Sequence, residues 1–355
     1  MGDPVSANLS WTGHVLVDVG IAGVCALTSR SRPEDVMLDD LDRVSDFIAE
    51  NYFSGKLDPY LNVVFLNSGY CGPNKTDPKS YEDVYRAHRV AAAGNVSPAR
   101  DGERCVFSDL PAGALVHRQH LPLFSAAHVM NFRPGGQTAV PIAGSYLVAV
   151  QFAPMAARRA EGRMLAVHAD GTSTILAFGR RYLEDNRRLL ALALPTERAL
   201  VHSSFAREQP MWDPQKKRYK MADVKGPRSL IMWDLTEIAG ESRPSDVRPH
   251  PVALTAYFLS NSGQGPSLEI FDIPSGAVSF VLRAAQGAGR SAWTRIRSNF
   301  QRLHDSTERS KPKRGRKATA GVPGRAGWSR NRAFEDLCKI FDAGFTDTVL
   351  ARGWL

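Results

Sequence analysis

A run of 13 nearly all apolar residues, Val15–Leu27, constrains the fold more than any other feature of the sequence. A membrane-spanning helix needs about 18 such residues, so this segment is too short to cross a bilayer. It therefore has to be buried in a protein core, as a helix or as a strand. No other apolar run approaches the length of a span, and the N-terminus lacks the features of a signal peptide.

Cysteine content and apolar content indicate a globular protein of a reducing compartment. The four cysteines, Cys25, Cys71, Cys105 and Cys338, are scattered through 355 residues, which does not suit a disulfide scaffold. Apolar residues make up 43% of the chain, enough to bury a core. We expect a cytoplasmic protein that does not contact membranes.

Charge is divided unevenly along the chain. Residues 1–83 hold 6 Lys/Arg and 13 Asp/Glu, whereas residues 84–355 carry a net charge of +16. The span 283–332 alone holds 14 basic residues against Asp305 and Glu308. Because a concentrated positive stretch attracts phosphate polymers, this distribution favours a nucleic-acid partner. The alternative is a solvated surface with one basic tail.

In the N-terminal third, the sequence pattern predicts alternating helices and strands. Apolar residues recur every three or four positions between Leu38 and Ile48, which predicts a helix that begins at Pro33. Tyr60–Leu66 follows a proline and is rich in β-forming residues, which predicts a strand. The glycine-rich segment Asn67–Pro78 predicts a loop.

In the middle of the chain, the sequence pattern predicts mostly strands. The expected strands are Val140–Phe152 (one long strand or a pair), Met164–His168, Thr172–Phe178, Leu230–Leu235, Val252–Ser260 and Leu268–Ile273. Asp170-Gly171 predicts a hairpin turn, and Arg180–Leu194 has a helical pattern. The expected fold class is mixed α+β, with a β-rich body and a helical, basic C-terminal region.

In the C-terminal region, the sequence pattern predicts helices and a basic arm. The expected helices are Ser275–Ala285, Ser291–Leu303 and a segment that begins at Asn331. Arg309–Lys317 holds six basic residues in nine and predicts a mobile arm. The expected division is an α/β body (1–285, with an acidic front 1–83 and a β-rich part 84–285), a basic helix (286–308), a flexible basic arm (309–330) and a short helical segment (331–355).

Standard catalytic motifs are absent from the sequence. It contains no P-loop, zinc-protease HExxH, hydrolase GxSxG or EF-hand pattern. His117 and His120 lie three apart, near Asp109, and are a candidate metal pair or general base. Because no cysteine pair or carboxylate stands at ligand spacing beside them, we expect packed or surface histidines, with no metal and no cofactor.

Two segments are the best candidates for nucleic-acid contact. Asn131–Gln137 (NFRPGGQ) combines amide and guanidinium groups, which read base edges, with two glycines. Trp212–Lys220 (WDPQKKRYK) interleaves aromatic and basic residues, a composition that suits stacking and phosphate contact. A structural turn and a solvated loop are the alternatives. Candidate phosphate contacts are Lys216, Lys217, Arg218, Lys220, Arg290, Arg295, Arg297, Arg302, Lys311, Lys313, Arg314, Arg316 and Lys317.

The opening segment Trp11–Ala22 (WTGHVLVDVGIA) resembles the W-T-G-x-P-F-V-D-x-G-[IL]-A motif of the large subunit of type I CRISPR surveillance complexes (Cascade), in its CXXC–CXXC branch. Leu66–Tyr70 is similar to the strand and N-S-G step of that family. Cys105–Pro122 resembles its zinc-knuckle region, and Asn131–Gly135 resembles its N-F-x-P-G motif. The resemblance covers roughly residues 9–300.

The chain departs from the family at its zinc ligands. The first C-x-x-C has Ser108 in the second cysteine position, and the second would fall near Ala143–Tyr146, which holds no cysteine. A four-thiolate zinc site therefore cannot form as it does in the family. Cys105 with His117 or His120 could hold a metal only in a new arrangement. The short C-terminal region suggests that a separate chain supplies the helical small subunit.

The resemblance implies a non-catalytic subunit near the 5′ end of the guide crRNA. Such a subunit reads the protospacer-adjacent motif on double-stranded target DNA, aids duplex opening and R-loop formation, and signals to a helicase–nuclease or a transposition protein. Its other partners are the Cascade backbone subunits. Asn131, Arg133 and Gln137, or alternatively Asn67 and Asn74, would read the motif.

Two other functions stay open from the sequence. The first is a metal-dependent enzyme that acts on nucleic acid through His117 and His120, with Asp109 and Cys105. The second is an architectural subunit that contacts protein and guide RNA but no DNA.

Overall fold

The computed structural model describes residues 5–65, 68–71, 75–89, 97–99, 101–117, 119–122, 139–160, 163–192, 209–213, 218–222, 227–241, 252–262 and 265–285. These residues confirm a mixed α+β fold, with 53% helix and 17% antiparallel sheet, so the body holds more helix than predicted. The chain divides into two compact units, Met1–Ser203 with Tyr257–Ile270, and Ser204–Ala256 with Phe271–Leu355. The predicted boundaries within the body, the arm and the C-terminal segment stay predictions.

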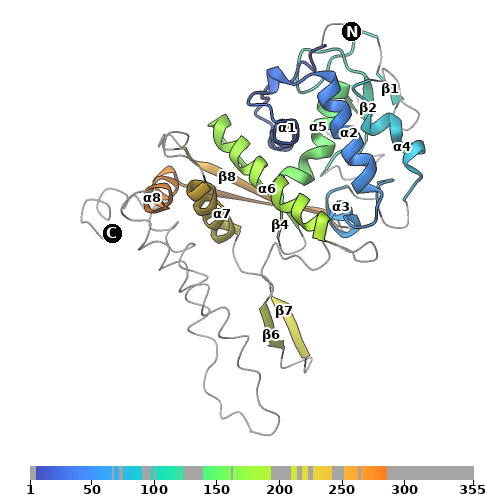
Figure 1. The fold of residues 1–355 in the computed structure, drawn as a ribbon. Helices are drawn as coiled ribbons and strands as arrows, with labels where there is room; N and C mark the ends of the chain where they lie inside the picture. The colour runs from blue at the N-terminus through green and yellow to red at the C-terminus, as the bar shows by residue number, and fades with distance from the viewer. Residues whose placement is uncertain are drawn as a thin grey trace, which may run out of the picture. The chain divides into compact units, whose positions relative to one another are not determined.

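The first unit contains a group of helices and two antiparallel sheets (Figure 1). Its elements, in chain order, are α1 (Val15–Thr28), η1 (Pro33–Asp35), α2 (Leu38–Tyr52), α3 (Asp58–Val64), α4 (Pro78–Tyr85), β1 (Ser97–Pro98), β2 (Ala114–Val116), β3 (Val140–Ile142), α5 (Gly144–Phe152), η3 (Ala153–Ala156), β4 (Arg158–Ala160), β5 (Arg163–Ala169) and α6 (Thr172–Leu192). The hairpin β8 (Leu254–Ser262) and β9 (Gly265–Ile273) contributes to it and continues into the second unit.

The apolar run of the sequence forms α1, the buried central helix of the first unit. It packs against α5 and α6. Small residues make these contacts close: a Cβ added at Gly20 would lie 1.9 Å from the carbonyl oxygen of Ala149 in α5. A Cβ added at Gly179 in α6 would lie 2.7 Å from the Cβ of Ala22. Larger side chains at these two glycines would force the helices apart.

Buried tyrosines fasten three segments to the end of α5 and to η3. Tyr52, at the end of α2, donates to the carbonyl oxygen of Gln151 at 2.8 Å, and Tyr60 of α3 donates to that of Pro154 at 2.9 Å. The hydroxyl of Tyr70 donates to Oε1 of Gln151 at 2.7 Å. Each phenol is fully buried, so these hydrogen bonds satisfy hydroxyls that water cannot reach.

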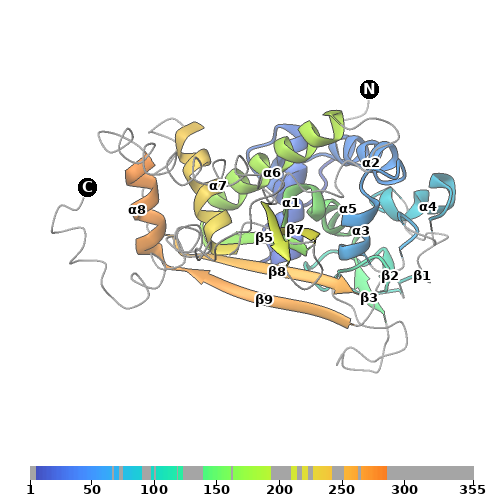
Figure 2. The same cartoon turned by 90° about the horizontal axis from the view of Figure 1, so that it is seen from below.

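Two sheets flank the helices. The order of the larger one is β4-β5-β8-β9, and Figure 2 shows β8 and β9 as long neighbouring strands that run in opposite directions. The smaller one has the order β1-β2-β3, with both strand pairs antiparallel. The predicted strands Met164–His168, Val252–Ser260 and Leu268–Ile273 correspond to β5, β8 and β9, with small differences at their ends.

Two predicted strands are wrong because their flanking residues begin helices instead. Tyr60–Leu66 was expected as a strand, but residues 58–64 form α3, in which the proline at position 59 occupies the first turn, where its missing N–H costs nothing. Thr172–Phe178 was expected as the second arm of a hairpin, but it opens α6. The N–H groups of Thr174 and Ile175 donate to the carbonyl oxygen of Gly171, which closes the first helical turn.

Two further strand predictions are wrong because these largely apolar segments form helices instead. Val140–Phe152 contains only the short strand β3, and its remainder is α5, whose residues from Ser145 to Phe152 are all buried. Leu230–Leu235 lies in α7 (Pro227–Glu241). A helix that is apolar all round shows no 3.6-residue period, so its sequence resembles a buried strand.

The helix predicted from Pro33 begins later in the structure. Pro33–Asp35 form the separate 3₁₀ turn η1, and α2 begins at Leu38. Asp40 accepts a hydrogen bond from the backbone N–H of Met37 at 3.1 Å and so caps this helix. Of the predicted buried stripe of α2, Leu41, Val44 and Ile48 are fully buried, whereas Leu38 is half-buried.

The second unit contains a two-stranded sheet and a helix pair. The strands are β6 (Gln209–Asp213) and β7 (Arg218–Ala222), which pair only with each other among the described strands. Helix α7 packs against α8 (Ser275–Ala285), whose bounds are those predicted from the sequence. No helix in the described part of the chain combines the length and apolar composition that a membrane span requires. The predicted helices 291–303 and 331–355 lie outside the described residues.

Candidate functional site

The opening motif folds around the carboxylate of Asp18, which is 2% exposed. Its Oδ1 accepts hydrogen bonds from the backbone N–H and the hydroxyl of Thr12, both at 2.8 Å. Its Oδ2 accepts the N–H of Gly13 at 2.9 Å and lies 3.0 Å from Nε2 of His168 in β5. Gly13 adopts a φ of 78°, which glycine reaches without strain. Asp18 therefore holds the Trp11–His14 loop in one conformation.

Hydrogen bonding keeps Asp18 ionised despite its burial. Burial alone would raise the pKa of Asp18, but the hydrogen bonds from His168 and Thr12 outweigh it and lower the pKa below its usual value. A buried carboxylate that orients an imidazole also occurs in catalytic triads. Here, however, three further donors from the loop share the same carboxylate. The arrangement suits the support of a loop more than proton transfer.

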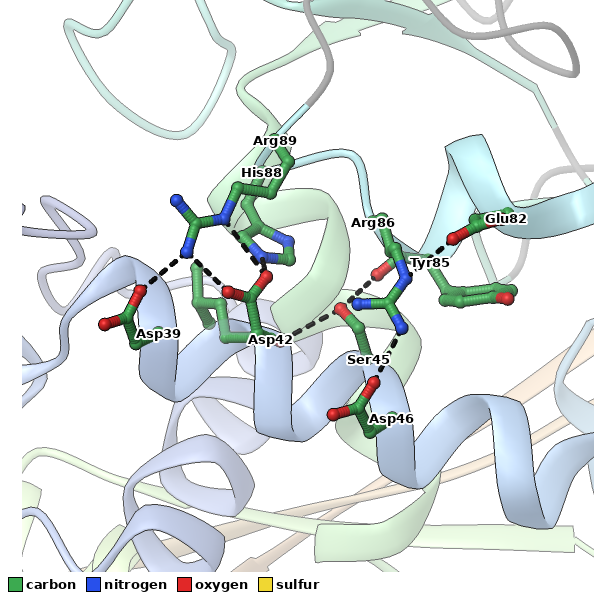
Figure 3. Close-up of polar contacts among 10 residues, drawn as sticks. Asp39, Asp42, Ser45, Asp46, Glu82, Tyr85, Arg86, His88 and Arg89 are labelled. Atoms are coloured by element: carbon green, nitrogen blue, oxygen red, sulfur yellow. Dashed lines mark hydrogen bonds and ion pairs between the residues drawn. The ribbon is translucent and has the colours of Figure 1, made fainter.

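A second polar cluster joins α2 to the segment that directly follows α4 (Figure 3). Arg86 pairs with Asp46 at 2.6 Å, and Arg89 pairs with both Asp42 and Asp39, the latter at 2.7 Å. The buried Ser45 donates to the carbonyl oxygen of Tyr85 at 2.6 Å. Figure 3 shows these side chains along one face of α2, opposite the segment that follows α4.

This cluster neutralises part of the acidic front. Hydrogen bonds from Arg89 are the main cause that lowers the pKa of Asp42 to about 2, and His88 contributes through a 2.8 Å contact. Burial lowers the pKa of His88, although Asp42 acts in the opposite direction. The acidic residues 39, 42 and 46 thus have partners within the chain, so the net charge of residues 1–83 overstates the negative surface offered to other molecules.

The segment that resembles a zinc knuckle keeps a tight hydrogen-bonded loop. Sγ of the buried Cys105 accepts the N–H of Phe107 at 3.4 Å, and Oγ of Ser108 accepts the N–H of Leu110 at 3.4 Å. Ser108 thus takes the place that a second thiolate would need. The region of the second C-x-x-C forms the start of α5 and has no cysteine. The residues present do not fit the family's four-thiolate zinc.

His117 and His120 lie on one turn, but the metal group of the alternative hypothesis, which adds Asp109 and Cys105, does not form among the described residues. His120 is fully buried, whereas Asp109 is exposed. The described residues contain no group of three or more His, Cys, Asp or Glu side chains that could hold a metal ion. The catalytic arrangement that would combine Asp109, His117, His120 and Cys105 is therefore not supported by the geometry.

The two ends of the segment Trp212–Lys220 form strands, whereas its composition indicated a loop; residues 214–217 lie outside the described part of the chain. These ends belong to β6 and β7, which pair antiparallel as a two-stranded ribbon. The register pairs Trp212 with Tyr219, Asp213 with Arg218, and Met211 with Lys220. Since alternate residues of a strand share a face, aromatic and basic positions fall on opposite faces of the ribbon.

Most of the other predicted site residues lie outside the described part of the chain. They are the motif readers Asn131, Arg133, Gln137, Asn67 and Asn74, the ribbon residues Lys216 and Lys217, and the basic residues Arg290, Arg295, Arg297, Arg302, Lys311, Lys313, Arg314, Arg316 and Lys317. Arg218 and Lys220 lie on β7. These assignments stay predictions.

Two groups of residues that sequence reasoning missed are central to the described structure. Asp18 is the only charged residue of its apolar run, a signal that a specific partner balances it. Its partner His168 lies 150 positions away, so no local pattern could identify it. The α2 acids and the Arg86–Arg89 segment are likewise separated by about 40–50 positions.

Comparison of the chain with protein-family models, with curated proteins and with solved structures finds no match.

Proposed function

We propose that this chain is a non-catalytic nucleic-acid-binding protein, a large subunit of a type I CRISPR Cascade-like surveillance complex. In that role it recognises the protospacer-adjacent motif, aids duplex opening and R-loop formation, and signals to a helicase–nuclease or a transposition protein. Its partners are guide crRNA, double-stranded target DNA, the backbone subunits and a separate small subunit, in the cytoplasm.

The β6–β7 ribbon is the single observation that carries the proposal. A two-stranded antiparallel ribbon is one of the elements that fit the major groove of duplex DNA. This ribbon carries Arg218 and Lys220 on β7, and Lys216 and Lys217 precede them in the sequence. It belongs to the part of the chain whose net charge is +16, which supports contact with phosphates.

The Asp18 network supports the resemblance to the Cascade subunit. In that resemblance, Thr12, Gly13 and Asp18 are motif positions, and here they bind one another directly. The motif therefore has a physical meaning in this chain, since its members jointly fix one loop. The alternative of a metal-dependent enzyme is less favoured, because the ring of His120 is fully buried and substrate could not reach a metal bound to it.

Neutralising the described basic residues of the ribbon tests the proposal. In R218Q/K220Q, we expect weaker binding to all duplex sequences. The slope of log K against log salt concentration should become shallower by ~1.8, since each phosphate contact contributes about 0.9. The matched control is K79Q/R187Q, which removes the same charge from exposed positions of α4 and α6.

Equal affinity and equal salt slopes for the two double variants would contradict the role of the ribbon. Footprinting of a target duplex by the assembled complex, with and without this chain, separates the proposal from an architectural subunit. Protection of the motif only when the chain is present supports DNA recognition. An unchanged footprint would favour a subunit that contacts only protein and guide RNA.

A further inference from the structure

Strand β9 lies at one end of the larger sheet. The order β4-β5-β8-β9 places β8 on one side of it and, among the described strands, no neighbour on the other (Figure 2). A strand in this position presents a row of N–H and C=O groups with which a further strand can pair. At nine residues, Gly265–Ile273 is as long as any strand in the described part of the chain.

The side chains of β9 add an apolar surface to this edge. Leu268 is 45% exposed and Ile270 is 56% exposed, and they are two of the four large apolar side chains that are exposed among the described residues. Since alternate residues of a strand share a face, both lie on the same face of β9. Glu269, between them, lies on the other face, where it pairs with Arg163 of β5. A strand that docks at the edge would bury the apolar pair.

The strand lacks the features with which proteins commonly protect a sheet edge. Lysine on an edge strand, or proline within it, hinders the pairing of a further strand. Pro266 stands at the beginning of β9, but Ser267–Ile273 contains no proline, lysine or arginine. Its charged residues are Glu269 and Asp272. The sequence of the strand therefore leaves most of its backbone able to pair.

Charge indicates the kind of segment that fits this edge. Asp272 is exposed and accepts a hydrogen bond from the hydroxyl of Thr255 at 3.0 Å, but it has no basic partner among the described residues. Pairing of β9 with β9 of a second copy would bring further carboxylates to the same edge. Because like charges opposite each other destabilise paired strands, a partner with Lys or Arg is favoured over a second copy.

We propose that β9 is a docking edge for an extended segment of another protein that carries apolar residues on one face, flanked by Lys or Arg. The segment adds to the sheet beside β9, and its main chain pairs with the N–H and C=O groups of the edge. Its apolar residues cover Leu268 and Ile270, and a basic residue faces Asp272. This surface is separate from the β6–β7 ribbon, so the proposal does not depend on nucleic-acid binding.

Binding of a synthetic strand to the full-length chain tests the proposal. The probe is a fluorescein-labelled peptide, Lys-Thr-Val-Thr-Val-Thr-Lys, in which the valines and lysines share one face. By fluorescence anisotropy at physiological ionic strength, we expect saturable binding to the wild type. L268T/I270T should bind at least ~5-fold more weakly, because two apolar cross-strand contacts are lost. V5T/V106T, which changes the other two exposed apolar side chains, is the matched control and should bind like the wild type.

Two altered peptides make the test independent of any substitution in the chain. A peptide N-methylated along its backbone has no N–H groups to donate and should not bind, and a peptide with Glu in place of Lys should bind more weakly than the probe. Absence of probe binding to the wild type, equal binding by L268T/I270T, or equal binding of either altered peptide would overturn the proposal. A wild-type dimer in sedimentation that L268T/I270T dissociates would also overturn it, in favour of a second copy.

Discussion

Replacement of Asp18 by asparagine tests whether one carboxylate holds the opening loop. The amide keeps the size of the side chain but removes its charge and one of its two acceptor atoms. In the wild type, each carboxylate oxygen accepts two hydrogen bonds, from Thr12 twice on one side and from Gly13 and His168 on the other. In D18N, the pair of donors that faces the NH₂ group loses its acceptor.

The expected cost follows from these contacts. Hydrogen bonds to a charged group contribute about 1.5–3 kcal/mol each, and two of the four are lost. With the lower figure, D18N should reduce the free energy of unfolding of the first unit by about 3 kcal/mol. Asp35→Asn is the control, because Asp35 pairs with Arg32 at the surface, where the pair is worth about 0–1 kcal/mol.

Urea unfolding at several pH values measures this effect and its origin. Since the pKa of Asp18 is lowered in the folded state, its contribution is present above the unfolded value and is lost as the pH falls through the folded value. The difference between wild type and D18N should therefore be largest near neutral pH and shrink below about pH 4. A D18N protein as stable as D35N, or a difference that persists undiminished in acid, would refute the reasoning.

Two other substitutions test the packing of the first unit. Gly20→Ala should destabilise the protein by about 3 kcal/mol, because the new methyl group meets the backbone of α5, whereas Gly240→Ala in the open should stabilise it by about 0.5–1 kcal/mol. Tyr70→Phe should cost about 1–3 kcal/mol, since it leaves Oε1 of Gln151 without its donor. Thermal or urea unfolding measures both, and a Gly20→Ala protein no less stable than Gly240→Ala would contradict the close contact of α1 with α5.

Sequence reasoning predicted well the helices with one buried face and the strands with a clear run of β-forming residues. Helix α2 has a regular apolar stripe, and α8 begins at Ser275, the residue that was expected to cap it. The neighbouring strands β8 and β9 are two β-rich runs, and the sequence between them contains a glycine. In α2 and α8 the local pattern of apolar residues reflects which side of the helix faces the core, whereas β9 was predicted from its β-forming residues although Leu268 and Ile270 are exposed.

The elements that it missed are those buried on every side or begun by a special residue. Helix α5 has no polar face, so its valines indicated a strand. The short helix α3 uses a proline that was interpreted as a strand boundary. Tertiary burial overrides β propensity in both segments, and single-sequence patterns do not contain that information.

The candidate site was predictable only in part. Composition identified the segment 212–220 as basic and aromatic. It did not indicate that the two ends of the segment form paired strands, which the structure shows as β6 and β7. A lone carboxylate in an apolar run should have marked Asp18 as paired. Its partner His168, and the pairing of Arg89 with Asp42, depend on contacts between distant segments that the fold alone creates.

The salt dependence of duplex DNA binding by the purified full-length chain tests the central claim most directly. Fluorescence anisotropy of a labelled duplex, titrated at several salt concentrations, gives both the affinity and its slope. The account predicts binding at low ionic strength, with log K falling linearly and steeply as log salt rises, because basic side chains displace counterions from phosphates. An affinity that is undetectable at low ionic strength, both for the chain alone and for its assembled complex, would contradict the account.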